Sequence, residues 1–328
     1  MDLEERRRLI TRNSAEVIGE EQLDVLLAQK EVVTYCGYET SGEIHLGHAV
    51  TVTKLMDLER AGFKVKILFA DWHTWLNKKG DWAWVRQQVE LWKKGFSALG
   101  LRHPEFVLGT QFQRDLAYVD DLLSLAQSTT LQRALRSMQQ VARDLDHAHV
   151  SQVLYPLMQI LDIKYLGVDV VQSGIEQRKI HMLGQEVFES VLHYKKPVFI
   201  HTPLIPSLQG PDAGKMSSSD ASSLISVRDD AQAIMKKLKK AYCPAGEIKD
   251  NPVLMIAQLV IFPRLEGKPF VLDRPEKFGG SLTYHSYEAL ERAFVDGLHP
   301  LDLKTAVARY LDEIFAPVRK VFSASVSS

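Results

Sequence analysis

Hydrophobic and polar positions along the chain follow two periods, which predict strands separated by helices. Short apolar runs rich in β-branched and aromatic residues predict buried strands over 31–38, 64–71, 105–110, 168–174 and 197–205. Apolar positions at helical spacing predict helices over 3–30, 45–62, 80–99, 151–165 and 176–192. The first strand, helix and strand form a βαβ unit, which requires a parallel sheet.

Two further segments complete the predicted organisation. The pattern is almost entirely helical over 116–149, which indicates an insertion at about 115–150 between the two halves of the sheet. Residues 206–223 are rich in Pro, Gly and Ser and lack periodicity, which is typical of a loop. Beyond them only helices are predicted, over 227–241, 251–262, 286–296 and 301–321. The expected fold is a Rossmann-like, doubly wound α/β domain with a helical insertion, followed by a small all-α C-terminal domain.

Composition narrows the class of protein. The chain has 328 residues, 45% hydrophobic and 25% charged, as in ordinary globular proteins of one or two domains. A formal net charge of −1 argues against a nonspecific nucleic-acid binder, so any RNA contact must be local. The charged start is not that of a secretory signal, and two cysteines are too few for a disulfide framework. A cytoplasmic location is therefore expected.

The tetrapeptide His45-Leu46-Gly47-His48 stands where the first predicted strand leads into a helix. Open α/β sheets bind ligands at this crevice, where a helix N-terminus offers backbone N–H groups to phosphate. Gly47 allows a ligand to approach the backbone, and the imidazoles add donors. Two alternatives stay open at this point. One is a metal clamp, although zinc prefers three or four ligands and no nearby cluster supplies them. The other is a pair of helix-start histidines without a role.

A second candidate is the segment GKMSSS, Gly214 to Ser219, within the predicted loop. Lys215 on such a loop could meet an anionic transition state and then withdraw. Taken alone, the segment could equally be a flexible linker with a helix cap. Together with the histidine pair, it indicates a nucleotide site made of two parts.

The two motifs resemble the His-Ile-Gly-His and Lys-Met-Ser-Lys-Ser signatures of class I aminoacyl-tRNA synthetases. Ser218 replaces the second lysine, a variant associated with tyrosyl enzymes of the archaeal and eukaryotic type. The resemblance to the tyrosyl-tRNA synthetases of that type covers nearly the whole chain, including GVDVVQSGIEQRKIHM, KKAYCPAG, RPEKFGG and LHPLDLK. It implies a tyrosine–tRNA ligase, which activates L-tyrosine with ATP and transfers it to the terminal adenosine of tRNA(Tyr).

The segment VLYPLMQILD suggests where an amino acid would bind. Tyr155, Gln159 and Asp162 share one helix face at spacings of four and three, and Pro156 is expected at the helix start. Spacing alone would also fit a solvent-facing stripe. The resemblance implies that Tyr35 and Asp162 hold the substrate phenol, while Tyr155, Gln159 and Gln177 hold its ammonium. The same resemblance places Leu68, His73, Phe112 and Gln113 in the lining of this pocket.

For ATP, the resemblance implies a set of contacts distributed over both signatures. It assigns the phosphates to His45 and His48, and the space beside the adenine to Gly47. Glu176 would accept hydrogen bonds from the ribose hydroxyls, although Ser173 replaces the first of two glycines that usually precede this site. Lys215 would stabilise the departing pyrophosphate, and Met216, Ser217 and Ser218 would also bind ATP. Mg²⁺ is expected to be carried by ATP, with no protein-bound metal.

The resemblance also implies tRNA contacts and a division into domains. Residues 1–205 would form the catalytic domain, 206–225 a mobile loop and 226–328 a helical anticodon-binding domain. Contacts with the acceptor stem are implied for Arg133, Arg136, Arg178 and Lys179, which could otherwise be plain surface charges. Anticodon contacts are implied for Phe278, His299 and Asp302, although LHPLDLK could simply start a helix. The family is homodimeric through the inserted helices, and no membrane partner is expected.

Three alternatives compete with tyrosine ligation. A tryptophan–tRNA ligase shares the fold, but a phenol site that both donates and accepts argues against indole, which only donates. A synthetase-like binding module that no longer acylates tRNA usually lacks part of the two signatures, and both are present here. A nucleotidyltransferase with the histidine motif would not need the Lys-Met-Ser loop together with a helical domain.

Overall fold

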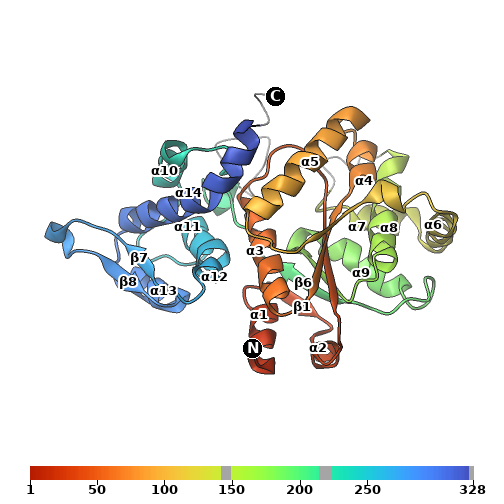
Figure 1. The fold of residues 1–328 in the computed structure, drawn as a ribbon, viewed down its shortest axis with the longest axis horizontal. Helices are drawn as coiled ribbons and strands as arrows, with labels where there is room; N and C mark the ends of the chain where they lie inside the picture. Colours follow the sequence, from red (N-terminus) through yellow and green to blue (C-terminus); the bar gives the residue numbers. More distant parts are fainter. Residues whose placement is uncertain (142–148, 214–223, 325–328) are drawn as a thin grey trace. The chain divides into compact units, whose positions relative to one another are not determined.

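The computed structural model describes residues 1–141, 149–213 and 224–324 (Figure 1). The chain divides into two compact units. Unit 1 comprises residues 1–41, 54–93 and 101–203, and unit 2 comprises residues 42–53, 94–100 and 204–328. The division cuts α3 (Leu46–Arg60) and α5 (Trp82–Ala98), so each of these helices contributes residues to both units.

Unit 1 is built on a six-stranded sheet with the order β1-β6-β5-β2-β3-β4. The strands are β1 (Glu16–Ile18), β2 (Val33–Tyr38), β3 (Lys64–Phe69), β4 (Glu105–Leu108), β5 (Val170–Gly174) and β6 (Val198–Thr202). All neighbouring pairs are parallel except β1 and β6. Every residue of β5 and β6 is buried, as expected for parallel strands covered on both faces. The strand order reverses between β2 and β5, which makes this pair the topological switch point.

Helices of unit 1 supply the other side chains of the candidate site. They include α1 (Leu3–Thr11), α2 (Leu23–Leu27), α4 (Asp71–Leu76), α6 (Leu116–Ser128), α7 (Leu131–Ser137), α8 (Val150–Tyr165) and α9 (Arg178–Val187). Short 3₁₀ turns form at η1 (Glu20–Gln22), η2 (Gly109–Gln111) and η3 (Ile175–Gln177). Figure 1 shows α7, α8 and α9 side by side, and α6 also packs on α8. A core cluster joins α8 and α9 to the sheet through Ile160, Ile180 and Phe199.

Unit 2 is mainly helical in its C-terminal part. Its elements are η4 (Pro211–Ala213), α10 (Ala231–Lys240), α11 (Pro252–Ile256), the π-helical turn η5 (Ala257–Ile261), α12 (Phe262–Leu265), β7 (Phe270–Leu272), η6 (Glu276–Phe278), β8 (Leu282–Tyr284), α13 (Tyr287–Val295) and α14 (Pro300–Ala324). Helices α10 and α11 pack against α14. None of the helices described in either unit combines the length and hydropathy needed to span a membrane.

The doubly wound sheet agrees with the expected fold class, and three details differ. The single helix expected over 3–30 is wrong, because β1 interrupts it and pairs with β6, a partner that no local pattern reveals. Helix α8 begins at Val150, so Pro156 lies inside it rather than at its start. The C-terminal region is helical but also contains the antiparallel pair β7 and β8, so the expectation of helices only was wrong.

Candidate active site

In unit 1, the residues that we expect to bind the substrate amino acid lie together near the carboxyl ends of β2 and β5. Tyr35 lies on β2, and Glu176 and Gln177 lie on η3, directly after β5. Helix α8 contributes Tyr155, Gln159 and Asp162. Tyr155 and Asp162 are buried, which excludes a solvent-facing stripe. The switch point of the sheet is thus lined by polar side chains from three elements, as ligand sites in open α/β sheets usually are.

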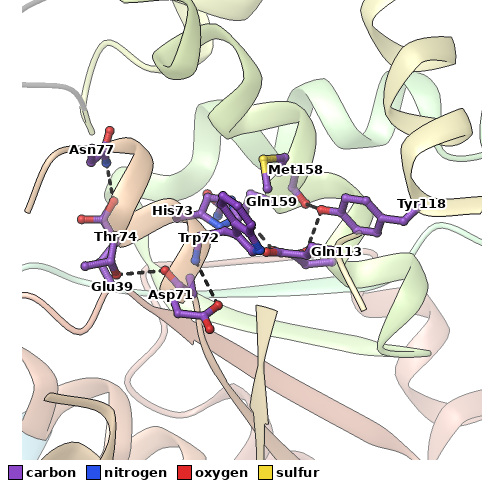
Figure 2. Close-up of polar contacts among 12 residues, drawn as sticks. Glu39, Asp71, Trp72, His73, Thr74, Asn77, Gln113, Tyr118, Met158 and Gln159 are labelled. Carbon is purple, nitrogen blue, oxygen red and sulfur yellow. Dashed lines mark hydrogen bonds and ion pairs between the residues drawn. The ribbon is translucent and has the colours of Figure 1, made fainter. Parts of the chain in front are cut away.

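Asp162 is the centre of a buried hydrogen-bond cluster. Its Oδ1 accepts from Gln113 Nε2 at 2.7 Å and from the Tyr118 hydroxyl at 2.9 Å. Both donors use the same oxygen, and His73 Nε2 lies 3.9 Å from Oδ2, beyond hydrogen-bond distance. Figure 2 shows His73, Gln113 and Tyr118 converging beside Met158 and Gln159. The second carboxylate oxygen is therefore the one left for a further donor.

Burial sets the protonation of this cluster. It raises the pKa of the Asp162 carboxyl to about 7, and it lowers the pKa of His73 to about 4. Burial, with the Asp162 charge as a smaller cause, raises the pKa of Tyr35 well above its usual value. Both ring nitrogens of His73 and Oε1 of Gln113 are buried without a hydrogen-bond partner in the described chain. Orphaned polar atoms of this kind are costly unless a ligand or water completes them.

The space above Gly37 adjoins the same cluster. Gly37 is exposed although it lies in an interior strand of the sheet. A Cβ at this position would meet Tyr35 Cε2 at 3.6 Å, Leu68 Cδ2 at 3.9 Å and Tyr35 Oη at 4.0 Å. The missing side chain therefore leaves an opening beside the Tyr35 hydroxyl and Leu68. Phe112 packs edge-on against Tyr118, with ring centroids 5.7 Å apart.

Sequence reasoning missed three contributors to this cluster. Tyr118 lies on α6, in the predicted insertion, and no local pattern distinguishes it from a packing aromatic residue. Asp71 anchors the turn that carries Gln113, because its carboxylate accepts from the Thr110 hydroxyl at 2.6 Å and the Thr110 backbone N–H at 3.0 Å. Gly37 did carry a signal, since a glycine inside a strand pattern often marks close approach of a ligand or another backbone.

The residues expected to hold an ammonium group also lie together. Gln159 Nε2 is 3.3 Å from Gln177 Oε1, and Gln177 Nε2 is 3.3 Å from Glu176 Oε1. Burial, and after it the Glu39 carboxylate, raise the pKa of Tyr155. The Glu176 side chain folds back over Gly174, where a Cβ would stand 2.1 Å from its Oε2. That oxygen is buried without a partner in the described residues, so it can accept from a ligand hydroxyl.

In unit 2, His45 and His48 occupy the start of α3. His45 Nδ1 accepts from the Gly47 backbone N–H at 3.1 Å, and His48 Nδ1 accepts from the His45 backbone N–H at 3.1 Å. Burial lowers the pKa of His45 to about 4 and holds the pKa of His48 well below its usual value, so both rings are neutral. A neutral ring that accepts at Nδ1 carries its proton on Nε2. Each ring therefore carries its proton on Nε2, and an imidazole N–H can donate to a phosphate oxygen.

The position of the His45 ring requires a glycine at residue 47. A Cβ at Gly47 would lie 2.9 Å from Cε1 and 3.1 Å from Nδ1 of His45. A larger residue would displace the His45 ring and break its contact with the Gly47 amide. Whether Gly47 also makes room for adenine stays a prediction.

Residues 225–227 are joined to the turn that precedes α3. The Leu46 N–H donates to Ile225 O at 2.9 Å, and the Val227 N–H donates to Ile44 O at 3.1 Å. His45 and Ser226 form the β-bridge between them, and Glu43 accepts from Arg228 at 2.9 Å. The segment that follows the Lys-Met-Ser motif is thus tied to the histidine motif. Lys215, Met216, Ser217 and Ser218 themselves lie outside the described residues.

The residues expected to contact the acceptor stem are surface groups of unit 1. Arg178 pairs with Glu16 through two contacts of 2.7 and 2.9 Å, and Arg133 pairs with Glu186 through two of 3.0 and 2.6 Å. Lys179 Nζ donates to Gln139 at 2.6 Å, and Arg136 lies on α7.

In unit 2, the residues expected to contact an anticodon lie in η6 and at the start of α14. Phe278 is 60% exposed, with Lys277 Nζ 5.0 Å from its ring centroid. His299 Nδ1 accepts from the Leu301 N–H at 3.1 Å and so caps α14, while Asp302 lies 3.9 Å from Arg274. LHPLDLK therefore does begin a helix. Its anticodon role stays a prediction.

Comparison with known proteins identifies the family. A model of the class I tRNA synthetases for tryptophan and tyrosine matches residues 27–316. The chain belongs to this family. Within the class I synthetases, it is 50% identical to the tyrosine–tRNA ligase of Methanopyrus kandleri over 328 residues, covering 99% of each chain. It is also 50% identical to the tyrosine–tRNA ligase of Archaeoglobus fulgidus, covering 99% of this chain and 100% of that one.

Solved class I synthetase structures share the fold over the whole chain. A crystal structure of the tyrosyl-tRNA synthetase from Archaeoglobus fulgidus, complexed with L-tyrosine, has a TM-score of 0.93 at 49% identity and covers 98% of this chain and 99% of that one. The corresponding enzyme of Pyrococcus horikoshii, also complexed with L-tyrosine, has a TM-score of 0.89 at 34% identity, with 99% and 97% covered. The expected fold class and the resemblance to archaeal-type tyrosyl enzymes are confirmed.

Proposed function

We propose that this class I synthetase is a tyrosine–tRNA ligase and that Asp162 recognises the substrate phenol. The observation that carries this proposal is that both hydrogen bonds to the Asp162 carboxylate use one of its two oxygens. Gln113 and Tyr118 both donate to Oδ1, so Oδ2 is left to accept a proton from the substrate hydroxyl. The Tyr35 hydroxyl, beside the opening at Gly37, donates to the same phenol oxygen. Each hydrogen-bonding role of a phenol is thereby filled.

This arrangement distinguishes the three aromatic amino acids. Phenylalanine would leave Asp162 Oδ2 and the Tyr35 hydroxyl without a partner, and sites of this kind reject the unhydroxylated analogue by roughly 10⁴ to 10⁵. (The system from which that magnitude was drawn is itself a tyrosyl-tRNA synthetase.) Tryptophan has an indole N–H that only donates, so it would leave the Tyr35 hydroxyl unused. The ammonium would bind Tyr155, Gln159 and Gln177. Discrimination of this size needs no separate editing site.

Activation follows from alignment and charge stabilisation. The tyrosine carboxylate attacks the α-phosphorus of ATP, the bond to the leaving pyrophosphate breaks, and tyrosyl-adenylate forms. The carboxylate is already a nucleophile, so no general base is required. His45 and His48 would donate Nε2–H groups to the phosphates. Glu176 would accept hydrogen bonds from the ribose hydroxyls. The remaining ATP contacts would come from Lys215, Met216, Ser217 and Ser218. Mg²⁺ would enter with ATP and neutralise phosphate charge. The described residues contain no group of three or more His, Cys, Asp or Glu side chains suited to a resident metal.

The second step transfers tyrosine to a terminal hydroxyl of tRNA(Tyr). Arg133, Arg136, Arg178 and Lys179 would contact the acceptor stem. Phe278 and His299 would stack on an anticodon base and Asp302 would accept from a guanine edge, as single-stranded RNA is usually recognised. We assign residues 1–205 to catalysis, 206–225 to the Lys-Met-Ser loop and 226–328 to anticodon binding. A cytoplasmic location is part of the proposal, and the free thiols of Cys36 and Cys243 are consistent with it.

A homodimer is also part of the proposed function. Leu116, Val119 and Leu123 form an exposed apolar stripe along α6, with exposed fractions of 83%, 38% and 63%. Their spacing of three and four residues puts them on one helix face. A second copy of the chain, docked through the same stripe, would bury them in an isologous interface.

Amino-acid-dependent ATP–pyrophosphate exchange tests the function directly. We expect exchange with L-tyrosine and none above background with phenylalanine or tryptophan, followed by charging of tRNA(Tyr). Exchange with tryptophan alone would leave the family intact but overturn the phenol site. Absence of exchange with all three, from folded protein, would overturn the ligase proposal.

A further inference from the structure

Unit 1 contains a line of buried hydrogen bonds that ends at the proposed ammonium site. It begins at the partly exposed ion pair of Arg178 and Glu16. It continues from Glu16 Oε2 to His201 Nδ1 at 3.2 Å, and from His201 Nε2 to His181 Nδ1 at 2.9 Å. It ends where His181 Nε2 lies 3.5 Å from Gln159 Nε2. His181 and His201 are 1% and 0% exposed, so water does not compete for these contacts.

The fold brings these residues together through two packing relationships. Glu16 and His201 are directly paired across the antiparallel strands β1 and β6. His181, on α9, stacks on His201 with ring centroids 5.2 Å apart and an interplanar angle of 11°. It also stacks on Phe199 at 4.7 Å. Stacking fixes the ring planes, and strand pairing fixes the carboxylate at the outer end.

The direction of each hydrogen bond follows from the outer end inward. Glu16, held by Arg178, has a lowered pKa and stays an ionised acceptor. Burial lowers the pKa values of His181 and His201, so each ring is neutral with a single N–H. His201 must therefore donate from Nδ1 to Glu16 and accept at Nε2. His181 then donates from Nδ1 to His201, and its bare Nε2 can only accept.

That polarity determines how Gln159 presents its amide. Its NH₂ group is the only part that can face the bare His181 Nε2, and the same group donates to Gln177 Oε1 at 3.3 Å. Within the described chain no residue donates to Gln159 Oε1. We propose that His181 is a positioning residue, which turns the Gln159 carbonyl oxygen toward the substrate ammonium through the hydrogen bonds from Glu16. This inference rests on the proposed function, because it requires Gln159 to bind that ammonium.

The tautomers can be read in the wild-type protein without any substitution. With ¹⁵N-histidine labelling, we expect the NMR shifts of His181 and His201 to report protons on Nδ1 in both rings. His45 and His48, which accept at Nδ1, provide internal references of the opposite tautomer. A proton on His181 Nε2 would overturn the proposal, because Gln159 would then have to present its oxygen to His181.

Two substitutions of His181 separate positioning from packing. In His181→Asn the amide replaces Nδ1 and the acceptor facing Gln159 is lost, whereas in His181→Gln the amide reaches the Nε2 position. We expect His181→Asn to weaken L-tyrosine binding by about 10- to 100-fold, the usual range for one hydrogen bond to a charged group. Binding of 3-(4-hydroxyphenyl)propionate, which lacks the ammonium, should not change. His181→Gln should bind tyrosine within about twofold of wild type.

The outcomes are distinguishable from failure of the proposed function. Equal loss of both ligands in His181→Asn, or no loss of either, would overturn the positioning role. In a Gln159→Leu background, His181→Asn should cause no further loss of tyrosine affinity, and an additive loss would overturn the proposal as well. If His181→Asn does not fold, Glu16→Ala at the partly exposed end makes the same comparison and should weaken tyrosine alone. Wild-type protein that fails to exchange with tyrosine would instead overturn the function, whatever the tautomers.

Discussion

The hydroxyl of Tyr118 and the carboxylate of Asp162 are joined by a 2.9 Å hydrogen bond that selects which carboxylate oxygen remains for a substrate. Met158 O lies 3.0 Å from the same hydroxyl, whose single proton the two acceptors share, so the Tyr118 side chain is held against helix α8. The geometry makes Tyr118 a support for Asp162 rather than a direct contact of the phenol.

Removing the Asp162 charge should impair tyrosine recognition. We expect Asp162→Asn to lower kcat/KM for tyrosine-dependent exchange by about 10- to 100-fold, since a hydrogen bond to a charged group is worth about 1.5–3 kcal/mol. Tyr118→Phe, which keeps the charge and removes one donor, should cost less. A larger loss in Tyr118→Phe than in Asp162→Asn would contradict the assigned roles. Exchange kinetics with tyrosine measure both.

The pH dependence should follow the Asp162 carboxyl. Its pKa is about 7 in the folded protein, against 3.8 for an unperturbed group, and the proposed phenol contact requires the ionised form. We expect kcat/KM for tyrosine to rise about tenfold per pH unit up to pH 7 and then level off. Asp162→Asn should abolish this rise. An unchanged profile in that variant would mean that another group titrates.

The same pKa shift has the opposite effect on stability. Between pH 4 and 7 the folded state keeps a proton on Asp162 that the unfolded state releases, so stability decreases as pH rises through this window. Asp162→Asn should therefore raise Tm more at pH 8 than at pH 5. Lys54, whose pKa burial lowers to about 7, titrates in the same range but is present in both proteins and cancels in the comparison.

A matched pair of glycine substitutions should distinguish a residue that leaves space for the substrate from a residue that is needed for packing. Gly37→Ala adds a Cβ whose neighbours stand at 3.6 Å or more, so the protein should fold with nearly unchanged Tm. Tyrosine exchange should fall at least about tenfold, because even one methylene in an apolar site is worth roughly 1–3 kcal/mol. Gly109→Ala instead places a Cβ 2.3 Å from Gln113 Oε1, so Tm should fall as well. Equal Tm losses would refute the distinction.

The Nε2–H donor of His45 can be tested by amide replacement. His45→Asn loses the donor at the Nε2 position, and we expect kcat of exchange to fall about 10²- to 10³-fold, as for other single transition-state donors. His45→Gln, with an amide near that position, should retain more activity. KM for tyrosine should not move in either variant. A matching loss in both variants would indicate that ring packing, rather than the donor, matters.

The exposed stripe on α6 predicts a change in oligomeric state. Leu123→Lys should convert a dimer into a monomer in sedimentation velocity, because a buried lysine without a partner is strongly unfavourable. Val25→Lys is the matched control, since Val25 is 68% exposed on α2, away from α6 in sequence. Dimers in both variants would place the interface elsewhere.

The sequence anticipated the parts of the site that local pattern or family motif can specify. The βα turn at His45 and the helix face of Tyr155, Gln159 and Asp162 follow from spacing. Their chemical roles followed only from the resemblance. Tyr118 and Gln113 reach Asp162 across 44 and 49 positions of sequence. The local sequence around Gln113 and Tyr118 does not predict their contact with Asp162, because only tertiary packing brings these side chains together.

The fold shows the same limit at β1. Residues 16–18 resemble their helical surroundings in composition, and their strand conformation depends on pairing with β6, about 180 positions later. The prediction that a helix starts at Pro156 was wrong for a related reason. A proline usually opens a helix, but α8 continues through it and buries Pro156, and the turn before it is anchored where the Ser151 hydroxyl donates to Leu76 O at 3.1 Å. In both cases a long-range contact outweighs the local preference.

The bridge between His45 and Ser226 acts as a tether. Lys215 precedes Ile225 by ten residues, so a fully extended chain cannot carry it more than about 35 Å from the backbone of the histidine motif. Its encounter with any anion bound there is intramolecular, with an effective concentration set by that short span rather than by diffusion. The proposed role of Lys215 would therefore require little intrinsic affinity between lysine and phosphate, and a weak contact of that kind would favour rapid release of the product.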